Sequence, residues 1–246
     1  EPKKMIDNTR NILERSDLNT VGLTEQIKTS HDGARCFVQY NLPAHSYQTG
    51  DGDTASLSLL STSSFDGTWP FMISVAAVQS ACTNLQVFVS GEVAIYKAKH
   101  TQSLDIEHGA NIIVKSLDVF NRERELWQQW QGQKVCDMEA FLFFADALNV
   151  NINTGGLDVG YSPADVIHNL KRRNENLNYI WRVYTAVYKK RLGSNYWAVY
   201  NAMTDWSTHF GVVRQSSERN IASIQNDRQQ VIRQAVNSKK FLRLAA

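Results

Sequence analysis

The sequence predicts an α+β fold, in which an antiparallel β-sheet is packed by a long helix and followed by a helical C-terminal part. Two observations lead to this prediction. Residues that favour strands are concentrated in runs separated by turn signals over roughly the first 100 residues. After His100 the apolar residues instead recur with a helical period. Several antiparallel strands in succession, followed by helices, are the expected arrangement.

The predicted strands occupy residues 34–40, 55–62, 71–78 and 85–98. Gly50-Asp-Gly-Asp and Phe65-Asp-Gly-Thr supply turns between the earlier runs. Ser90-Gly91 divides the last run, so we expect a tight hairpin between residues 85–89 and 93–97.

Two helices are predicted next. The first is capped by Ser103, carries Asp105 and Glu107 in its first turn and ends at Gly132. The second is capped by Asp137 and continues to Leu148, and its Phe-rich sequence predicts a central position. Residues 149–160 are the expected loop or linker.

The strongest helix start is Ser162-Pro163-Ala164-Asp165, with a cap, a proline at the first position and an acid at the third. This helix is predicted to continue to Arg191 and to end at Gly193. Ser194 is expected to open another helix, and a last helix is expected over residues 218–237. The chain then divides into an α+β core domain, residues 1–150, and a basic helical region, residues 161–246, which can pack on the core as one domain.

The net charge of +2 conceals two parts of opposite sign. Residues 1–167 contain 12 Lys and Arg against 20 Asp and Glu, a net charge of −8. Residues 168–246 contain 14 Lys and Arg against 4 Asp and Glu, a net charge of +10. Cations interleaved with Trp and Tyr are typical of a surface that binds polyanions, and a solvated helix face is the structural alternative.

The predicted helix from Ser162 places its cations on one side. At about 100° per residue, Lys171, Arg182 and Lys189 fall within about 20° of one another. Arg172 and Lys190 lie on the adjoining strip. Lys189, Lys190 and Arg191 also come at the end of this helix, where cations offset the helix dipole without any ligand.

Several function classes lack their signatures. No metal-ligand spacing of His and Cys, no phosphate-binding loop and no Gly-x-Ser-x-Gly elbow occurs in the sequence. Gly50-Asp-Gly-Asp resembles half of a calcium loop but lacks the downstream Glu. A nuclease built from scattered acids such as Asp66, Asp105 and Glu107 is the remaining enzyme hypothesis. The sequence therefore predicts a protein that is not an enzyme and needs no cofactor.

Composition also bears on the cellular setting. No apolar run approaches the roughly 20 residues that a membrane helix requires, and the chain opens with a polar, helix-like segment rather than a leader. Cys36, Cys82 and Cys136 are odd in number and widely spaced, which favours buried, reduced thiols. We expect a cytoplasmic protein without membrane contact.

Several short motifs together resemble the landmarks of a phage- and plasmid-borne domain-of-unknown-function family, number 932. They cover roughly residues 28–210 in order: Ser30-His-Asp-Gly-Ala-Arg-Cys-Phe-Val-Gln-Tyr-Asn-Leu-Pro, Ser63-Ser-Phe-Asp-Gly-Thr-Trp-Pro-Phe, Ala81-Cys-Thr-Asn, Lys99-His-Thr and Tyr196-Trp-Ala-Val-Tyr-Asn-Ala-Met-Thr-Asp-Trp. This resemblance implies an origin in mobile elements and no established activity.

The predicted element order is also similar to the core of Rad52-like single-strand annealing proteins. That similarity implies an oligomeric ring or filament that holds single-stranded DNA in a positive groove. Lys97 and Lys99, alternating on the last strand, would then join Lys171, Arg172, Arg182, Lys189, Lys190 and Arg191 along the groove. Lysines on an edge strand also prevent aggregation between sheets, which is their structural alternative.

Two functional hypotheses follow. The first is an oligomeric protein that binds and anneals single-stranded nucleic acid without a nucleotide cofactor. The second is a self-assembling structural protein of a phage or plasmid particle, in which the −8 and +10 regions of neighbouring subunits bind each other. A DNA-modifying enzyme ranks third.

Overall fold

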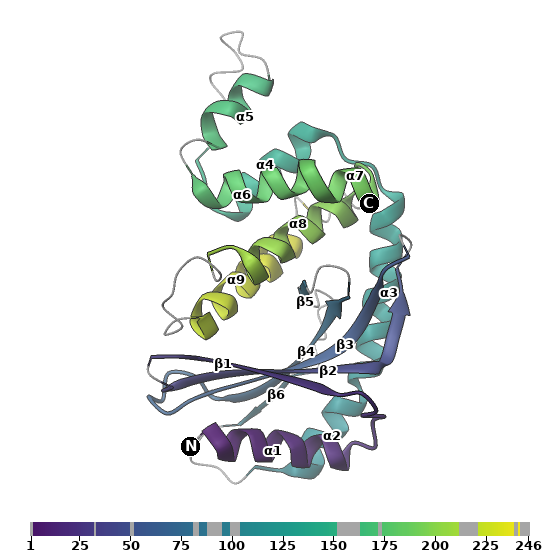
Figure 1. Ribbon diagram of the computed structural model, residues 1–246, viewed down its shortest axis with the longest axis vertical. Helices are drawn as coiled ribbons and strands as arrows, with labels where there is room; N and C mark the ends of the chain where they lie inside the picture. The colour runs from purple at the N-terminus through teal and green to yellow at the C-terminus, as the bar shows by residue number, and fades with distance from the viewer. Residues whose placement is uncertain are drawn as a thin grey trace.

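The structure is a computed structural model of the 246-residue chain. It describes residues 2–31, 33–49, 52–80, 84–87, 95–98, 104–151, 163–171, 174–211, 221–238 and 241. An antiparallel sheet is formed by the N-terminal half and is followed by helices, so the predicted α+β class is confirmed (Figure 1). Within these ranges, no helix is long and apolar enough to cross a membrane.

The sheet joins six strands of the described chain: β1 (Thr24–Ser30), β2 (Arg35–Gln48), β3 (Thr54–Ser64), β4 (Phe71–Gln79), β5 (Leu85–Val87) and β6 (Ile95–Ala98). The first four pair in sequence order, each antiparallel to the next. The strand β1 was not predicted, because its sequence, Thr-Glu-Gln-Ile-Lys-Thr-Ser, is mostly polar, as suits its position at the sheet edge.

The predicted hairpin between residues 85–89 and 93–97 is wrong. Both strands pair with β4 instead, β5 opposite Ala76–Val78 and β6 opposite Phe71–Ser74. The nine-residue β4 offers one long edge, and pairing with a central strand satisfies backbone groups that a small isolated hairpin holds only marginally. Ser90 and Gly91 lie outside the described residues.

Helices cover both faces of the sheet. Val38, Leu57 and Val75 point to the face that carries α1 (Pro2–Arg15), where the Thr9 hydroxyl lies 2.9 Å from that of Ser61. The opposite face is overlaid by α8 (Tyr196–His209) and α9 (Ile221–Val236) (Figure 1). Burial from both sides explains why β3 is buried along nearly its whole length.

The helix predicted over residues 103–132 is divided at Lys115 into α2 (Ile106–Val114) and α3 (Ser116–Gly132). Its cap is Asp105, whose carboxylate accepts a hydrogen bond from the His108 backbone; Ser103 lies outside the described residues. α2 packs closely on α1 at Gly109, where an added Cβ would approach Ile12 to 3.0 Å. α3 instead continues toward the C-terminal helices, so the two segments take different directions (Figure 1).

α4 (Asp137–Ala147) is capped by Cys136 rather than Asp137. The Cys136 sulfur accepts from the Glu139 backbone N–H, and the Glu139 carboxylate accepts from that of Cys136. This position exposes Cys136, so the prediction of a buried thiol is wrong there, whereas Cys36 is buried as expected. Cys82 lies outside the described residues.

The single helix predicted from Ser162 to Arg191 is also wrong. α5 (Pro163–Lys171) begins at the predicted proline, but α6 (Glu175–Val183) starts anew after Asn174, which caps the Leu177 N–H. A π-helical turn, η2 (Tyr184–Tyr188), and α7 (Lys189–Leu192) then lead to Gly193, whose φ of +87° ends the helix. Thr185 donates its hydroxyl to the Trp181 carbonyl at 2.9 Å, a contact that disturbs a regular helix ladder.

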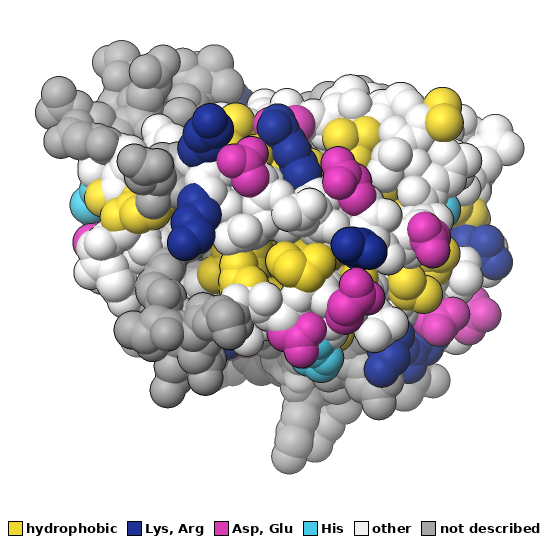
Figure 2. Space-filling model, turned by 90° about the horizontal axis from the view of Figure 1, so that it is seen from below, with side chains coloured by type: hydrophobic (Ala, Val, Ile, Leu, Met, Phe, Trp, Pro, Cys, Tyr) yellow, Lys and Arg dark blue, Asp and Glu magenta, His cyan; other side chains and the backbone are white. Residues whose placement is uncertain are grey.

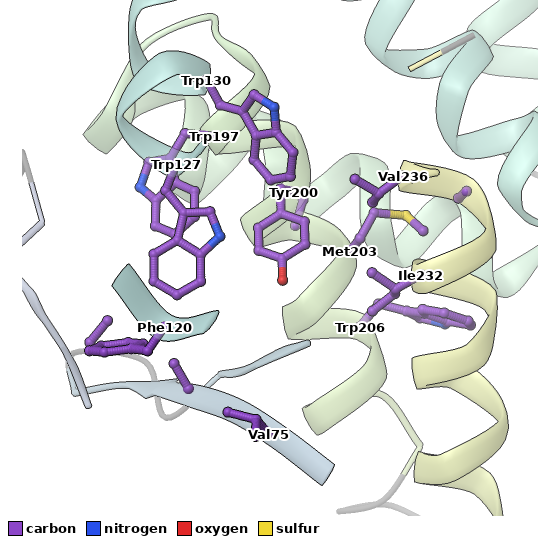
Figure 3. Close-up of a cluster of buried hydrophobic side chains, with 14 of the residues drawn as sticks. Val75, Phe120, Trp127, Trp130, Trp197, Tyr200, Met203, Trp206, Ile232 and Val236 are labelled. Carbon is purple, nitrogen blue, oxygen red and sulfur yellow. The ribbon is translucent and has the colours of Figure 1, made fainter. Parts of the chain in front are cut away.

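α8 is buried along most of its length, and Asn195 rather than Ser194 caps it. Trp197 and Tyr200 of α8 pack on Trp127 and Trp130 of α3, with ring centroids 5.3 and 5.1 Å apart (Figure 3). The same buried cluster extends from α1 to Phe241. Residues of both predicted regions therefore share one hydrophobic core.

Phe241 anchors part of the C-terminal tail. Its fully buried ring lies 5.0 Å from Trp130, 4.9 Å from Phe143 and 5.2 Å from Tyr196. At Phe241 the tail is docked in the chain's own core, while Lys239 and Lys240 lie outside the described residues.

We expect Phe241→Ala to lower the free energy of unfolding by about 3–4 kcal/mol, because truncating a buried Phe leaves a cavity. Urea denaturation measures this change. Phe65→Ala is the matched control, since Phe65 is 45% exposed and should cost less than about 1 kcal/mol. Equal effects of the two substitutions would contradict the docked tail.

Candidate functional site

Four of the predicted nucleic-acid-binding cations are exposed in the structure, and one of them, Arg191, is paired with an acid and is described below. Arg182 lies on α6, Lys190 on α7 and Lys97 on β6. The Arg182 guanidinium lies over the Tyr179 ring, 5.4 Å from its centroid. These three side chains remain candidates for contact with a polyanion.

Two of the predicted cations have acidic partners from the N-terminal half. The Lys189 ammonium lies 2.6 and 2.8 Å from the two carboxylate oxygens of Asp137. Arg191 lies 3.9 Å from Asp53, and its guanidinium covers the Tyr188 ring. Both residues therefore tie α7 to the rest of the chain.

The other three predicted cations have side chains that lie outside the described part of the chain. Lys171 ends α5, and its side chain is outside what the structure describes, as are Lys99 and Arg172. The predicted stripe through Lys171, Arg182 and Lys189 is wrong in its geometry. It assumed one continuous α-helix, whereas Asn174 begins a new helix and η2 changes the residue period.

The face that carries α1 has no comparable concentration of positive charge among its described residues. Lys and Arg side chains on this face are interspersed with Asp and Glu (Figure 2). Arg10, for example, is bound to Glu25 at 2.9 Å. The C-terminal helices are therefore the better candidates for a polyanion site.

A half-buried carboxylate connects these helices. Asp205 of α8 accepts hydrogen bonds from the hydroxyls of Tyr179 and Tyr188, each at 2.7 Å. Tyr179 comes from α6 and Tyr188 from the π-helical turn, so one carboxylate joins both of these elements to α8. Burial and the bond to Asp205 raise the pKa of Tyr179 above its ordinary value.

Asn84 extends this network to the sheet. Its amide donates to the Tyr188 oxygen at 2.7 Å and to the Asn201 carbonyl at 3.3 Å. The Asn84 carbonyl oxygen lies 3.1 Å from Nε2 of His209. The residue just before β5 thus fixes side chains on both η2 and α8.

A cavity of about 460 Å³ opens beside the network. It is lined by Glu175, Asn178, Tyr179, Arg182, His209, Phe210 and Gly211. The rings of Tyr179 and Phe210 form an aromatic wall, with centroids 4.7 Å apart. Aromatic rings, an arginine and exposed polar groups in one cavity suit a planar, polar or anionic ligand.

Comparison with known proteins gives a family. Residues 1–227 match the family model described as Domain of unknown function (DUF932). The chain belongs to this family. No curated protein and no solved structure matches it.

Two of the motifs noted in the sequence meet in the network. Asn84 ends the motif Ala81-Cys-Thr-Asn, and Asp205 belongs to the motif from Tyr196 to Trp206. Neither Asn84 nor Asp205 was predicted from the sequence to have a role. Polar residues within otherwise apolar motifs, as in α8, were the signal that could have identified them.

The aromatic wall of the DUF932 cavity is supported from behind by Arg228 of α9. Its guanidinium donates to the Trp206 carbonyl at 3.0 Å and to the Phe210 carbonyl. It also lies over the rings of Trp206 and Phe210, 5.0 and 5.4 Å from their centroids. Burial lowers the pKa of Arg228. Its hydrogen bonds to two backbone carbonyls give this cation a structural role.

The acids considered for a nuclease do not converge. Asp66 pairs with Arg35 at 3.0 Å, and hydrogen bonds from Thr68 hold its pKa well below its usual range. Asp105 caps α2, and Glu107 lies 4.0 Å from Arg15. In the described part of the DUF932 chain, no group of three or more His, Cys, Asp or Glu could hold a metal ion.

Lys28 of β1 is a further cation that the sequence analysis missed. It shares its sheet face with Phe37 and lies 5.9 Å from that ring. This is the face overlaid by α8 and α9, opposite to α1. Burial lowers the pKa of Lys28 to about 8.

We expect Asp205→Asn to destabilise the DUF932 fold by about 2–3 kcal/mol, because an amide retains one acceptor oxygen and leaves one tyrosine hydroxyl opposite an NH₂ group. Chemical denaturation measures the change. Asp118→Asn, an exposed acid on α3, is the matched control and should change stability by less than about 0.5 kcal/mol. A similarly small effect at Asp205 would contradict its linking role.

We expect Lys28→Met to stabilise the protein by about 1–2 kcal/mol at pH 7, with allowance for the solvent that still reaches the ammonium. In the unfolded state the Lys28 ammonium keeps its proton up to a pKa of about 10.4, whereas in the folded state it loses the proton near pH 8. The free energy of unfolding of the wild type therefore rises as the pH increases between these values. The advantage of the variant should therefore shrink from pH 7 to pH 10. Denaturation at both pH values measures it, and a constant difference would contradict the lowered pKa.

Proposed function

We propose that this protein binds single-stranded nucleic acid through α6, α7 and the cavity beside them. The observation that carries this proposal is the position of Arg182, an exposed cation stacked on Tyr179 at a cavity with an aromatic wall. Phosphates require cations, and unpaired bases require rings on which to stack. Both are present together on α6.

The charge distribution supports the same surface. The cavity and α7 lie within the part of the sequence that carries a net charge of +10. Arg182 and Lys190 are eight residues apart, roughly 12 Å along the helix axis, and both are exposed. Their spacing allows contact with more than one phosphate of the same strand.

The aromatic wall supports binding of single strands over duplexes. Tyr179 and Phe210 are half-buried, so part of each ring is accessible at the cavity. A base can reach such a wall only when it is unpaired and unstacked. Stacking of one base on an aromatic side chain contributes about 1–3 kcal/mol.

Annealing is the activity that we propose for the bound state. The support is the order of elements, an antiparallel sheet followed by helices and a basic surface, which is similar to that of Rad52-like annealing proteins. On this proposal the protein acts as a ring or filament, without a nucleotide cofactor, in the cytoplasm of the host of a phage or plasmid. Fold similarity alone does not transfer function, so annealing requires its own assay.

A self-assembling structural protein is the second candidate. The pairs Lys189–Asp137 and Arg191–Asp53 join the basic region to acids of the N-terminal half within one chain. The same complementarity between chains would produce head-to-tail assembly. On this alternative, the exposed cations contact a neighbouring subunit.

We expect the double variant Arg182→Glu, Lys190→Glu to weaken binding of a labelled oligothymidine at least tenfold and to reduce the slope of log affinity against log salt by about one per lost phosphate contact. Fluorescence anisotropy at several salt concentrations measures both quantities. Lys115→Glu, an exposed cation between α2 and α3, is the matched charge-reversal control. If wild-type protein fails to bind at low salt, the proposal is wrong and self-assembly becomes the better account.

A further inference from the structure

An acid lies among the ligand-facing groups of the cavity. Glu175 is the first residue of α6, is exposed and lines the cavity with Asn178, Tyr179 and Arg182. It forms no ion pair with any described residue. A carboxylate at a polyanion surface repels phosphate, so its presence there points to a different part of the ligand.

The hydrogen-bonding chemistry of a carboxylate restricts which part of the ligand Glu175 can bind. An ionised Glu only accepts hydrogen bonds, and it can accept two parallel ones. Guanine presents two adjacent N–H donors, at N1 and N2, on its Watson–Crick edge. Thymine and uracil present a single donor between two carbonyl oxygens, which a carboxylate repels, while adenine and cytosine present only their amino group beside a ring acceptor.

The other groups of the cavity complete the match. The exposed Asn178 amide, one turn after Glu175, can donate to the guanine O6. Tyr179 is held in place by Asp205, and its ring becomes available for stacking when the exposed Arg182 side chain that covers it turns away. Arg182 lies one further turn along α6, in reach of a phosphate flanking the base.

We propose that the cavity accepts one unpaired guanine of the bound strand, with Glu175 on N1 and N2, Asn178 on O6 and Tyr179 against the ring. This inference rests on the proposed binding of single strands and adds the identity of the base. A base held in this way is withheld from pairing while its neighbours remain accessible. The cavity then sets the position of each subunit along a strand.

A purely structural role for Glu175 makes a different prediction. An acid in the first helical turn is favourable against the helix dipole, by a few tenths of a kcal/mol at an exposed site. Glu175→Gln would then alter stability slightly and leave base preference unchanged. Base preference therefore separates the two roles.

The test uses the full chain and labelled oligothymidines in which one central thymine is replaced by guanine, adenine or cytosine. Fluorescence anisotropy gives the affinity for each. We expect wild-type protein to bind the guanine-containing strand about tenfold more tightly than oligothymidine, and Glu175→Gln to reduce this preference below about twofold. Glu125→Gln, an exposed acid on α3, is the matched control and should retain the preference.

Each other outcome overturns the inference in a distinguishable way. Equal affinity for all four strands, with binding still weakened by Arg182→Glu, would remove the guanine site and leave the proposed function intact. A preference for adenine or cytosine, or a guanine preference that survives Glu175→Gln, would also refute it. If no strand binds at low salt, both the guanine site and the proposed function are wrong.

Discussion

The arrangement of the C-terminal helices depends on the carboxylate of Asp205. It accepts from Tyr179 of α6 and Tyr188 of η2, and Tyr188 in turn accepts from Asn84 at the start of β5. Hydrogen bonds to a charged group contribute about 1.5–3 kcal/mol each, more than a neutral pair. One side chain therefore fixes the positions of α6, the π-helical turn and the sheet relative to α8, and it positions Tyr179, the ring that forms one side of the cavity.

The burial of α8 is the second constraint. Its side chains contact the tryptophans of α3 on one side and the residues of α9 on another (Figure 3). Because α8 has little contact with solvent, the positive charge of this half is carried by the helices around it. Among these surrounding helices, α6 and α7 carry the exposed cations Arg182 and Lys190.

Much of the fold could be predicted from local signals. Turn residues separated β2, β3 and β4 correctly, and Pro163 and Gly193 marked a helix start and a helix end. The break before Asn174 and the π-helical turn were missed because apolar residues continue at helical spacing across both. Only tertiary contacts decide where such a helix is interrupted. β5 and β6 were paired with each other because a sequence shows turn residues but not the open edge of β4. The cavity could not be predicted, since its residues come from 175–182 and 209–211 and meet only after α6 folds against α8.

The π-helical turn has a consequence for how this region tolerates insertion and deletion. A π turn is equivalent to an α-helix with one residue added, and the Lys189 N–H accordingly bonds to the Tyr184 carbonyl five residues earlier. The wider turn absorbs the added residue, so loss of one residue here, such as the exposed Val187, would restore a regular helix and keep α7 in nearly the same rotational position relative to α6. Gain of a further residue would instead rotate α7 by about 100° and take Lys189 away from Asp137. The cavity on α6 and the cations on α7 therefore keep their relative orientation when this turn shortens by one residue and lose it when the turn lengthens.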